Sequence, residues 1–379
     1  MKALFLALAV VSSAPGQAWD PSTVERTLEA ELAETRTPGA ALVVVRGDEI
    51  LLSKGFGVAS VETREPVTPD HLFRLGSTTK LFTAMALTTL AEQGKIDLKR
   101  PVGTIMPGLP GFVAQVSAHQ LLSHTAGIKD QPADFGLHDE SALAAFPRGW
   151  GDDYRPAAPG VAFSYSNPGL MGRFALAFLN GGRLEGTEVL SPAAIARVST
   201  PQAEIPYDLP DMKRPRYGYG LFLHTGDGVA LAEHVGTMPG FTSILKMATE
   251  ERFAVILLAN QEGVMFEKTL AAAFSSFGKV AASTTPEPKS VPMTESEMET
   301  VTGVYRNRWP VTIVHQEGAL FLEQFGGRFP VTRLGGDLFS AEPPDGRRAI
   351  PFRLVAGADG KGELLQMFLW VFKKEEVAP

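Results

Sequence analysis

The alternation of apolar and polar positions along the chain predicts an antiparallel sheet with helices packed on it. Residues 40–46 and 49–55 are apolar strand candidates, and Gly47-Asp48 between them is a strong hairpin signal. The other predicted strands are residues 217–224, 229–235, 242–248 and 253–260, and the predicted helices are 24–36, 78–92, 169–180, 192–198 and 266–277. Strands and helices in this order indicate an α/β (α+β) domain over residues 19–280.

The chain changes character after residue 280. Residues 281–295 read AASTTPEPKSVPMTE, a composition typical of a linker. Residues 296–379 then carry short alternating strands, such as 310–314, 319–323 and 364–372, separated by Gly, Pro and Asp turns. This pattern predicts a C-terminal small antiparallel β domain, either a barrel or a sandwich. We therefore expect two domains, 19–280 and 296–379, joined by the linker 281–295.

The first 18 residues resemble a secretory signal peptide. Lys2 supplies the positive start, residues 4–11 are apolar, and Gly16-Gln17-Ala18 is a small-x-small cleavage site. The alternative is a buried N-terminal helix. The apolar run is too short to span a bilayer. We expect residues 1–18 to be removed, which predicts a periplasmic or secreted protein with no stable membrane anchor after cleavage.

The composition of the chain excludes several kinds of functional site. The chain has no cysteine, which rules out disulfides, thiolate metal sites and a cysteine nucleophile. Its net charge of -7 and its lack of a basic run argue against a nucleic-acid partner. The seven histidines are scattered, and the sequence has no H-E-x-x-H, G-x-S-x-G, P-loop or G-x-G-x-x-G motif. No metal and no cofactor are expected.

Ser77 and Lys80 form the most informative pair in the sequence. They lie three residues apart at the start of the apolar helix 78–92, so they share one helix face. A lysine on a buried helix is costly unless it is paired or its pKa is lowered. A serine hydroxyl beside such an amine, at a helix N-terminus, favours an activated nucleophile. Ser276 and Lys279 have the same spacing, but they flank Gly278 near a helix end.

Tyr165-Ser166-Asn167 supplies further groups. A tyrosine beside Lys80 would relay protons, and Asn167 would hydrogen-bond the lysine or a substrate amide. The structural alternative is a core tyrosine followed by an asparagine turn. Tyr305-Arg306-Asn307 repeats the pattern, but in the C-terminal region.

His234-Val235-Gly236-Thr237 is the third group, at the end of a predicted strand. Gly236 allows a substrate backbone to approach closely. The Thr237 N–H would join the Ser77 N–H as an oxyanion hole. A lone histidine is more often structural than catalytic. His224-Thr225-Gly226 repeats the spacing in a predicted hairpin turn.

Ser77-x-x-Lys80, Tyr165-x-Asn167 and His234-x-Gly236, in this order, resemble the motifs of the serine β-lactamase-like superfamily. The resemblance is closest to its branch of class C β-lactamases, D-alanyl-D-alanine carboxypeptidases, D-aminopeptidases and β-lactamase-fold esterases. The flanking phrases FRLGS, LLSHTAG and PGF at residues 73–77, 121–127 and 239–241 strengthen it. It implies a β-lactamase/transpeptidase-like fold. The stretch from Asn167 to His234 is short for the family, which implies a shortened helical subdomain.

The resemblance implies an exported serine hydrolase that acts on a small-molecule ester or peptide. Ser77, Lys80 and Tyr165 would be catalytic, and Asn167, His234, Gly236 and Thr237 would bind substrate. β-Lactamases carry lysine where this chain has His234, and a histidine is largely neutral above pH ~6.5. Esters or D-amino-acid peptides are therefore favoured over β-lactams. The alternatives are a β-lactamase or penicillin-binding D,D-peptidase, and a non-catalytic protein that binds peptidoglycan or a partner with the same fold.

Overall fold

The computed structural model describes most of the two expected domains. The described residues are 19–109, 111–127, 164–205, 212–276, 290–306, 310–324, 326–343, 349–356, 362–367 and 370–375. The expected signal peptide 1–18 and most of the expected linker 281–295 lie outside the described residues.

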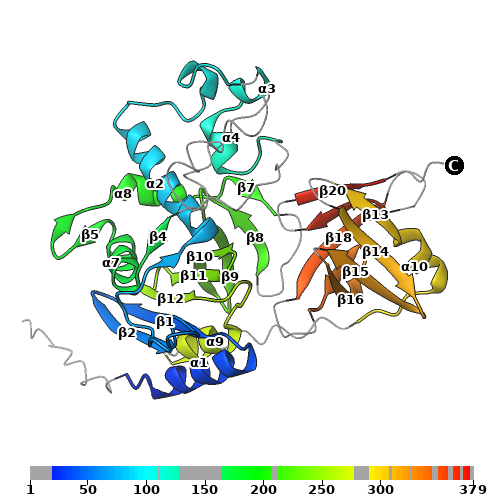
Figure 1. Cartoon of the computed structure of the whole chain (residues 1–379). Helices are drawn as coiled ribbons and strands as arrows, with labels where there is room; N and C mark the ends of the chain where they lie inside the picture. The colour runs from blue at the N-terminus through cyan, green and yellow to red at the C-terminus, as the bar shows by residue number, and fades with distance from the viewer. Residues whose placement is uncertain are drawn as a thin grey trace, which may run out of the picture.

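The first domain is built on one antiparallel sheet of eight strands, in the order β2-β1-β12-β11-β10-β9-β8-β7 (Figure 1). The strands are β1 (Gly39–Arg46), β2 (Glu49–Gly57), β7 (Ala203–Glu204), β8 (Lys213–Tyr217), β9 (Phe222–Gly226), β10 (Val229–Met238), β11 (Phe241–Ala248) and β12 (Phe253–Ala259). The predicted hairpin at Gly47-Asp48 joins β1 to β2, with Arg46 opposite Glu49 and Gly47 at φ 59°. Glycine suits this left-handed position because it has no Cβ.

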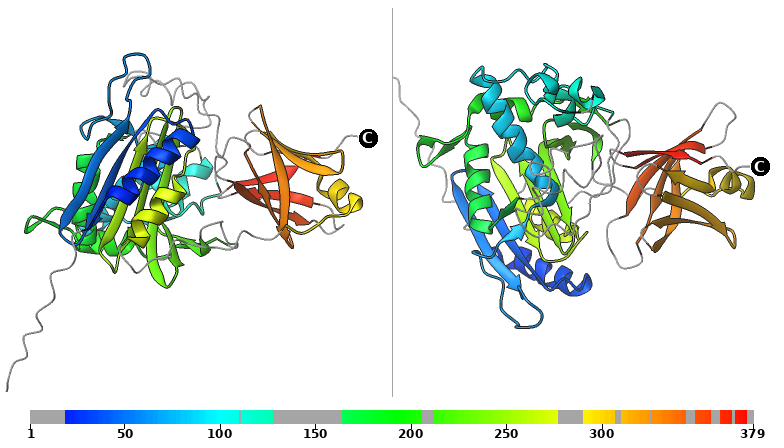
Figure 2. Two further views of the ribbon diagram at one scale, coloured as in Figure 1. Left: turned by 90° about the horizontal axis from the view of Figure 1, so that it is seen from below. Right: turned by 45° about the horizontal axis from the view of Figure 1, so that its top comes forward.

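Both faces of the sheet are covered by helices. Helices α1 (Ser22–Glu34) and α9 (Glu267–Ser275) lie on one face, and α2 (Thr79–Glu92), α7 (Pro168–Leu179) and α8 (Pro192–Val198) pack on the other (Figure 2). The central strands supply both cores by simple alternation. Leu42 and Val44 of β1 pack toward α1, whereas Val43 and Val45 pack toward α7 and α2. A strand buried on both faces reads as a continuous apolar run, as residues 40–45 do.

Short elements complete this domain around the start of α2. Strand β3 (Phe73–Arg74) pairs with β4 (Tyr165–Ser166), and the 3₁₀ turn η1 (Gly76–Thr78) leads into α2. The remaining short elements are η2 (Val102–Thr104), α3 (Gly111–Ala114), α4 (Ala118–Leu122), β5 (Arg183–Leu184) and β6 (Thr187–Glu188). Helices α3 and α4 lie beyond the end of α2 in Figure 1. The expected shortening of the helical subdomain concerns residues that lie partly outside the described ranges.

The second domain is a closed antiparallel barrel, which settles the choice between barrel and sandwich. Its elements are α10 (Glu295–Val301), β13 (Gly303–Arg306), β14 (Pro310–Gln316), β15 (Ala319–Gln324), β16 (Gly327–Gly335), β17 (Leu338–Ala341), β18 (Ile350–Ala356), β19 (Gly362–Met367) and β20 (Trp370–Lys374). Tyr305, Leu322 and Phe352, among others, form a buried core of its own. Side chains therefore fill its interior.

Two predicted strands are wrong in extent. Residues 217–224 were expected as one strand, but β8 ends at Tyr217 and β9 begins at Phe222. Gly220 between them has φ 74°, and the Gly218 N–H donates to Leu221 O, so the chain turns there. Residues 364–372 likewise contain the end of β19 and most of β20, which pair as a hairpin with Met367 opposite Trp370.

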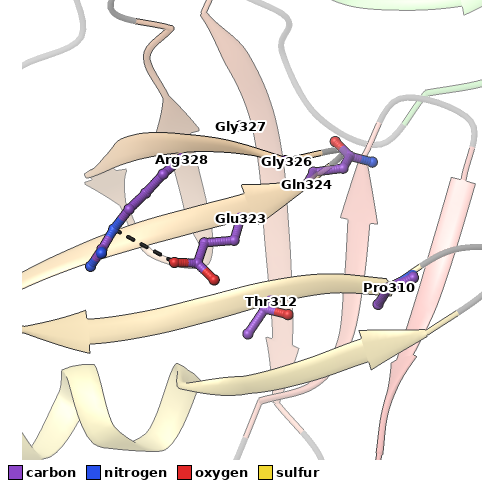
Figure 3. Close-up of a pocket in the computed structure, with 7 residues that line it drawn as sticks. All are labelled: Pro310, Thr312, Glu323, Gln324, Gly326, Gly327 and Arg328. Atoms are coloured by element: carbon purple, nitrogen blue, oxygen red, sulfur yellow. Dashed lines mark ion pairs between the residues drawn. The ribbon is translucent and has the colours of Figure 1, made fainter.

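The barrel also carries an open hollow on its outer wall. It is lined by Pro310, Thr312, Glu323, Gln324, Gly326, Gly327 and Arg328, and an ion pair joins Glu323 to Arg328 at 3.6 Å (Figure 3). None of these seven lining residues is a serine or a lysine. Across the described ranges, none of the helices combines the length and the apolar character needed to cross a membrane.

Candidate active site

Ser77 and Lys80 lie together, as the sequence predicts. Ser77 is the middle residue of η1, and Lys80 lies in the first turn of α2. Lys80 Nζ donates a hydrogen bond to Ser77 Oγ at 2.7 Å. Both residues are half-buried, so the pair is shielded from bulk water but still accessible. A short contact of this kind is what transfer of the hydroxyl proton to an amine requires.

Gly76 brings the backbone of the nucleophile against β10. Its φ is 51°, and a Cβ built there would lie 2.8 Å from Thr237 N and 3.1 Å from Thr237 O. Only glycine fits this left-handed and crowded position. The contact sets the Thr237 amide beside the turn that carries Ser77, as expected for two oxyanion-hole donors.

Gly236 and Ser243 fix the same turn from the other side. A Cβ on Gly236 would lie 1.9 Å from Leu75 O, so no side chain can be tolerated at this position. Ser243, opposite Gly236 on β11, donates its hydroxyl to Leu75 O at 2.6 Å and lies 2.8 Å from Thr78 Oγ1. These contacts on both sides of Gly76 lock the turn that presents Ser77. No local motif points to Ser243, because its partner Leu75 is 168 residues away in the chain.

His234 lies on the same sheet face as the nucleophile, but it is buried rather than open to substrate. Its side chain is 5% exposed. Nδ1 is 2.8 Å from Val235 O, which can only accept, so Nδ1 carries the proton. Nε2 therefore accepts from the Tyr217 hydroxyl at 3.1 Å. Burial, with help from the nearby Lys80 charge, lowers the pKa of His234 to about 3.

These contacts show that the predicted titration of His234 is wrong. The sequence predicts a histidine that is largely neutral above pH ~6.5 and takes up a proton below it. In the structure both ring nitrogens are engaged and the imidazole stays neutral far below that pH. Burial also raises the pKa of Tyr217, which keeps its hydroxyl as a donor to the ring. The sequence analysis missed Tyr217, which lies on β8 with no local motif.

Tyr165 lies on β4, beside the strand β3 that precedes Ser77, and its hydroxyl accepts a hydrogen bond from Arg74. Tyr165 lies opposite Arg74 in the β3–β4 pair, and Arg74 Nε donates to Tyr165 Oη at 2.9 Å. The Tyr165 side chain is 54% exposed. The expected direct contact of this hydroxyl with Ser77 and Lys80 is not among the hydrogen bonds of the described residues.

Asn167 caps helix α7. Its Oδ1 accepts from the Leu170 N–H at 2.8 Å, the usual role of an asparagine just before a helix. The cap fixes the side chain and leaves its amide N–H groups as donors.

His124 is a neighbour of the site that the sequence analysis did not single out as functional. It lies in the LLSHTAG phrase, has φ 57°, and its ring packs against Tyr217 at 5.1 Å. His124 is an exposed residue, but its pKa is lowered. The larger cause is desolvation of the ring by the surrounding protein, and the smaller cause is the Lys80 charge. His124 and His234 are therefore both near enough to Lys80 for its charge to act on them, and both rings contact Tyr217.

The three sequence alternatives to the motif residues lie elsewhere. Tyr305 is fully buried in the barrel core and donates to Val301 O at 2.8 Å. His224 is opposite Leu231, whose side chain packs on the α1–α9 face, so it lies on the far side of the sheet. Ser276 ends α9 and accepts from Trp19 Nε1, while its partner Lys279 is outside the described residues. Where the chain is described, no group of three histidines and carboxylates is placed to hold a metal ion.

Part of the chain is similar to known proteins. Residues 24–173 match the family model described as Beta-lactamase. Protein flp of Staphylococcus aureus (strain N315) is 28% identical over 153 residues, which cover 38% of this chain and 30% of that protein. Esterase EstB of Burkholderia gladioli is 34% identical over 110 residues, 28% of each chain. The aligned region thus spans less than a third of these relatives.

The whole fold has solved counterparts. The crystal structure of SurE with D-Leu superimposes with a TM-score of 0.65 at 22% identity, over 93% of this chain and 99% of that one. Because that overlap includes nearly all of both domains, the likeness extends to the barrel as well as the sheet. Residues 24–173 are therefore similar to the Beta-lactamase family, and the chain as a whole shares the fold of the SurE structure.

Proposed function

We propose that this chain is an exported serine hydrolase that acts through an acyl-enzyme on esters or D-amino-acid peptides. The observation that carries the proposal is the 2.7 Å contact between Lys80 Nζ and Ser77 Oγ. The close approach of Gly76 to Thr237 supports the proposal further, because it sets the Thr237 amide beside the turn that carries Ser77. A nucleophile, a base and oxyanion donors are the parts that acyl transfer needs.

In this mechanism Ser77 Oγ attacks the carbonyl carbon while its proton passes to Lys80 Nζ. The carbonyl oxygen becomes an oxyanion held by the N–H groups of Ser77 and Thr237. The geometry favours Lys80 as the base, because the Tyr165 oxygen accepts from Arg74. Tyr165 then gives its proton to the leaving alcohol or amine, and the proton held by Lys80 returns to the Tyr165 oxygen through water. In the second round Lys80, again neutral, takes a proton from the water that attacks the acyl-serine, and this proton passes to Ser77 Oγ as the acid leaves.

The relatives support both substrate classes. One is named an esterase, and SurE was crystallised with D-Leu. The neutral His234 disfavours β-lactams, since it provides no permanent cation at the position where β-lactamases carry lysine. We also propose that the chain takes no metal, no cofactor and no nucleic-acid partner, and that Asn167 N–H groups orient the substrate.

A fluorophosphonate probe tests the proposal directly. Wild-type protein should be labelled, Ser77→Ala should not, and the matched control Ser276→Ala should be labelled like wild type. Absence of labelling in the wild type would favour the non-catalytic binding protein. On substrates, kcat/KM for a short-chain nitrophenyl ester should exceed that for a chromogenic cephalosporin. The reverse order would restore the β-lactamase or D,D-peptidase alternative.

Export has its own test. We propose that residues 1–18 are a signal peptide and that the mature protein is periplasmic or secreted. N-terminal sequencing of protein from the periplasm or medium should begin at Trp19. Recovery of the intact N-terminus from the cytoplasm would contradict this location.

A further inference from the structure

Because His234 is neutral, it cannot bind an anionic group of a substrate as a cation would. β10 supplies no cation to the site, because the imidazole is buried and both its nitrogens are bonded within the protein. Lys80 is engaged with the nucleophile. If the substrate carries an anionic group, another residue has to meet it.

Arg74 is placed to do so. Its Nε donates to Tyr165 Oη at 2.9 Å, and its guanidinium lies over the rings of Tyr165 and Phe241, at 5.6 and 5.9 Å. The residue is half-buried. In the described part of the chain no carboxylate is paired with it, and its terminal Nη groups have no hydrogen-bond acceptor. A guanidinium held by two rings and one hydroxyl therefore keeps its two-pronged donor end open.

Arg74 is also close enough to the reacting centre. It precedes Ser77 by three residues, a span of at most about 10 Å between backbones. Phe241, which packs on Arg74, is opposite Met238 at the end of the β10–β11 hairpin, next to the oxyanion donor Thr237. Arg74, Tyr165 and Phe241 therefore border the same site as Ser77 and Thr237.

We propose that Arg74 is a specificity-determining residue that binds a carboxylate of the substrate, so that the preferred substrates are esters or peptides with a free carboxylate near the scissile carbonyl. This inference rests on the proposed function and names its substrate class. Tyr165 holds the guanidinium through Nε, and the two Nη groups meet the carboxylate oxygens side by side. Such charge-assisted, two-pronged contacts are stronger and more directional than single neutral hydrogen bonds.

The test compares pairs of esters that differ in one carboxylate. For the acyl side, the mono-4-nitrophenyl ester of glutaric acid is compared with 4-nitrophenyl butyrate. For the leaving-group side, 3-acetoxybenzoate is compared with phenyl acetate. In the wild type, at least one anionic ester should have the higher kcat/KM of its pair. Arg74→Ala should lower this charge preference by about 10- to 100-fold, mainly through KM. Arg74→Lys, which keeps the charge but loses the fork, should restore it in part.

The outcomes separate the inference from the function on which it rests. Arg173→Ala, which removes an exposed arginine on α7, serves as the control and should keep the wild-type preference. If Ser77→Ala abolishes hydrolysis of both esters but Arg74→Ala lowers both equally, the hydrolase stands and the carboxylate role is overturned. If the wild type hydrolyses no ester, the function fails, and calorimetric titration with glutarate decides about Arg74. Equal binding by wild type and Arg74→Ala would then overturn the inference.

Discussion

At the scale of single residues, proton positions around Ser77 are set by a few buried hydrogen bonds. Tyr217 and Val235 hold His234 in one neutral form, and Lys80 contacts the nucleophile. The order of Ser77, Lys80 and His234 in the motifs was readable from the sequence. Whether His234 faces water or the core was not, because its partner Tyr217 is on another strand and has no motif.

His234 should not titrate in the physiological range. Its folded pKa of about 3 lies below the ordinary value of 6.5, so the unfolded chain takes up the proton more readily. The contribution of His234 to the free energy of unfolding is therefore fully present above pH ~6.5, and it is lost as the pH falls from there toward 3. The lost stability amounts to at most about 1.4 kcal/mol per pH unit. NMR of the ring C–H groups should show no titration shift of His234 between pH 7.5 and 5. A midpoint near 6.5 would contradict the buried neutral imidazole.

Lys80→Ala should lower kcat for a nitrophenyl ester by at least about 10²-fold, as expected for loss of a positioned base. Tyr165→Phe should lower kcat less for this ester, whose nitrophenolate leaves without help, than for an alkyl ester or amide. Steady-state kinetics on the two kinds of substrate measure the difference. Equal losses on both would mean that Tyr165 does not protonate the leaving group.

At the scale of elements, the site exists because one 3₁₀ turn docks on one hairpin. Gly76 in η1 and Gly236 in β10 meet without side chains, and Ser243 in β11 bonds the chain on both sides of Gly76. Apolar alternation predicted the strands of the hairpin well. It could not predict the docking, which depends on contacts between residues more than 150 positions apart. The same pattern wrongly predicted β8 and β9 as parts of one strand, because the turn at Gly218 to Leu221 lies inside an apolar run.

Ser243→Ala should therefore cost both stability and activity. It leaves Leu75 O without its donor and Thr78 Oγ1 without its buried partner, so the free energy of unfolding should fall by about 1–3 kcal/mol. Ser53→Ala is the matched control: its buried Oγ has no hydrogen-bond partner among the described residues, so its loss should be nearly neutral. Urea denaturation measures both. Similar effects in the two variants would show that the Ser243 contacts do not hold the turn.

At the scale of the whole molecule, the chain has separate cores for the sheet domain and the barrel. Leu257 belongs to the core between the sheet and the helices α1 and α9, whereas Leu322 belongs to the barrel core. From the change of pattern after residue 280, the sequence predicts two domains, 19–280 and 296–379. The sequence could not predict that the strands close into a barrel, because a sandwich has the same alternation of apolar positions.

If the cores are independent, a cavity in one should leave the other intact. Leu322→Ala and Leu257→Ala both truncate a fully buried leucine, which typically costs about 2–5 kcal/mol. Calorimetry of the intact chain should show two unfolding transitions. Leu322→Ala should lower only the barrel transition and preserve fluorophosphonate labelling of Ser77. Leu257→Ala should lower the other transition, and labelling should disappear with it. If either variant shifts both transitions together, the barrel and the sheet domain unfold as one cooperative unit, and the barrel supports the candidate active site directly.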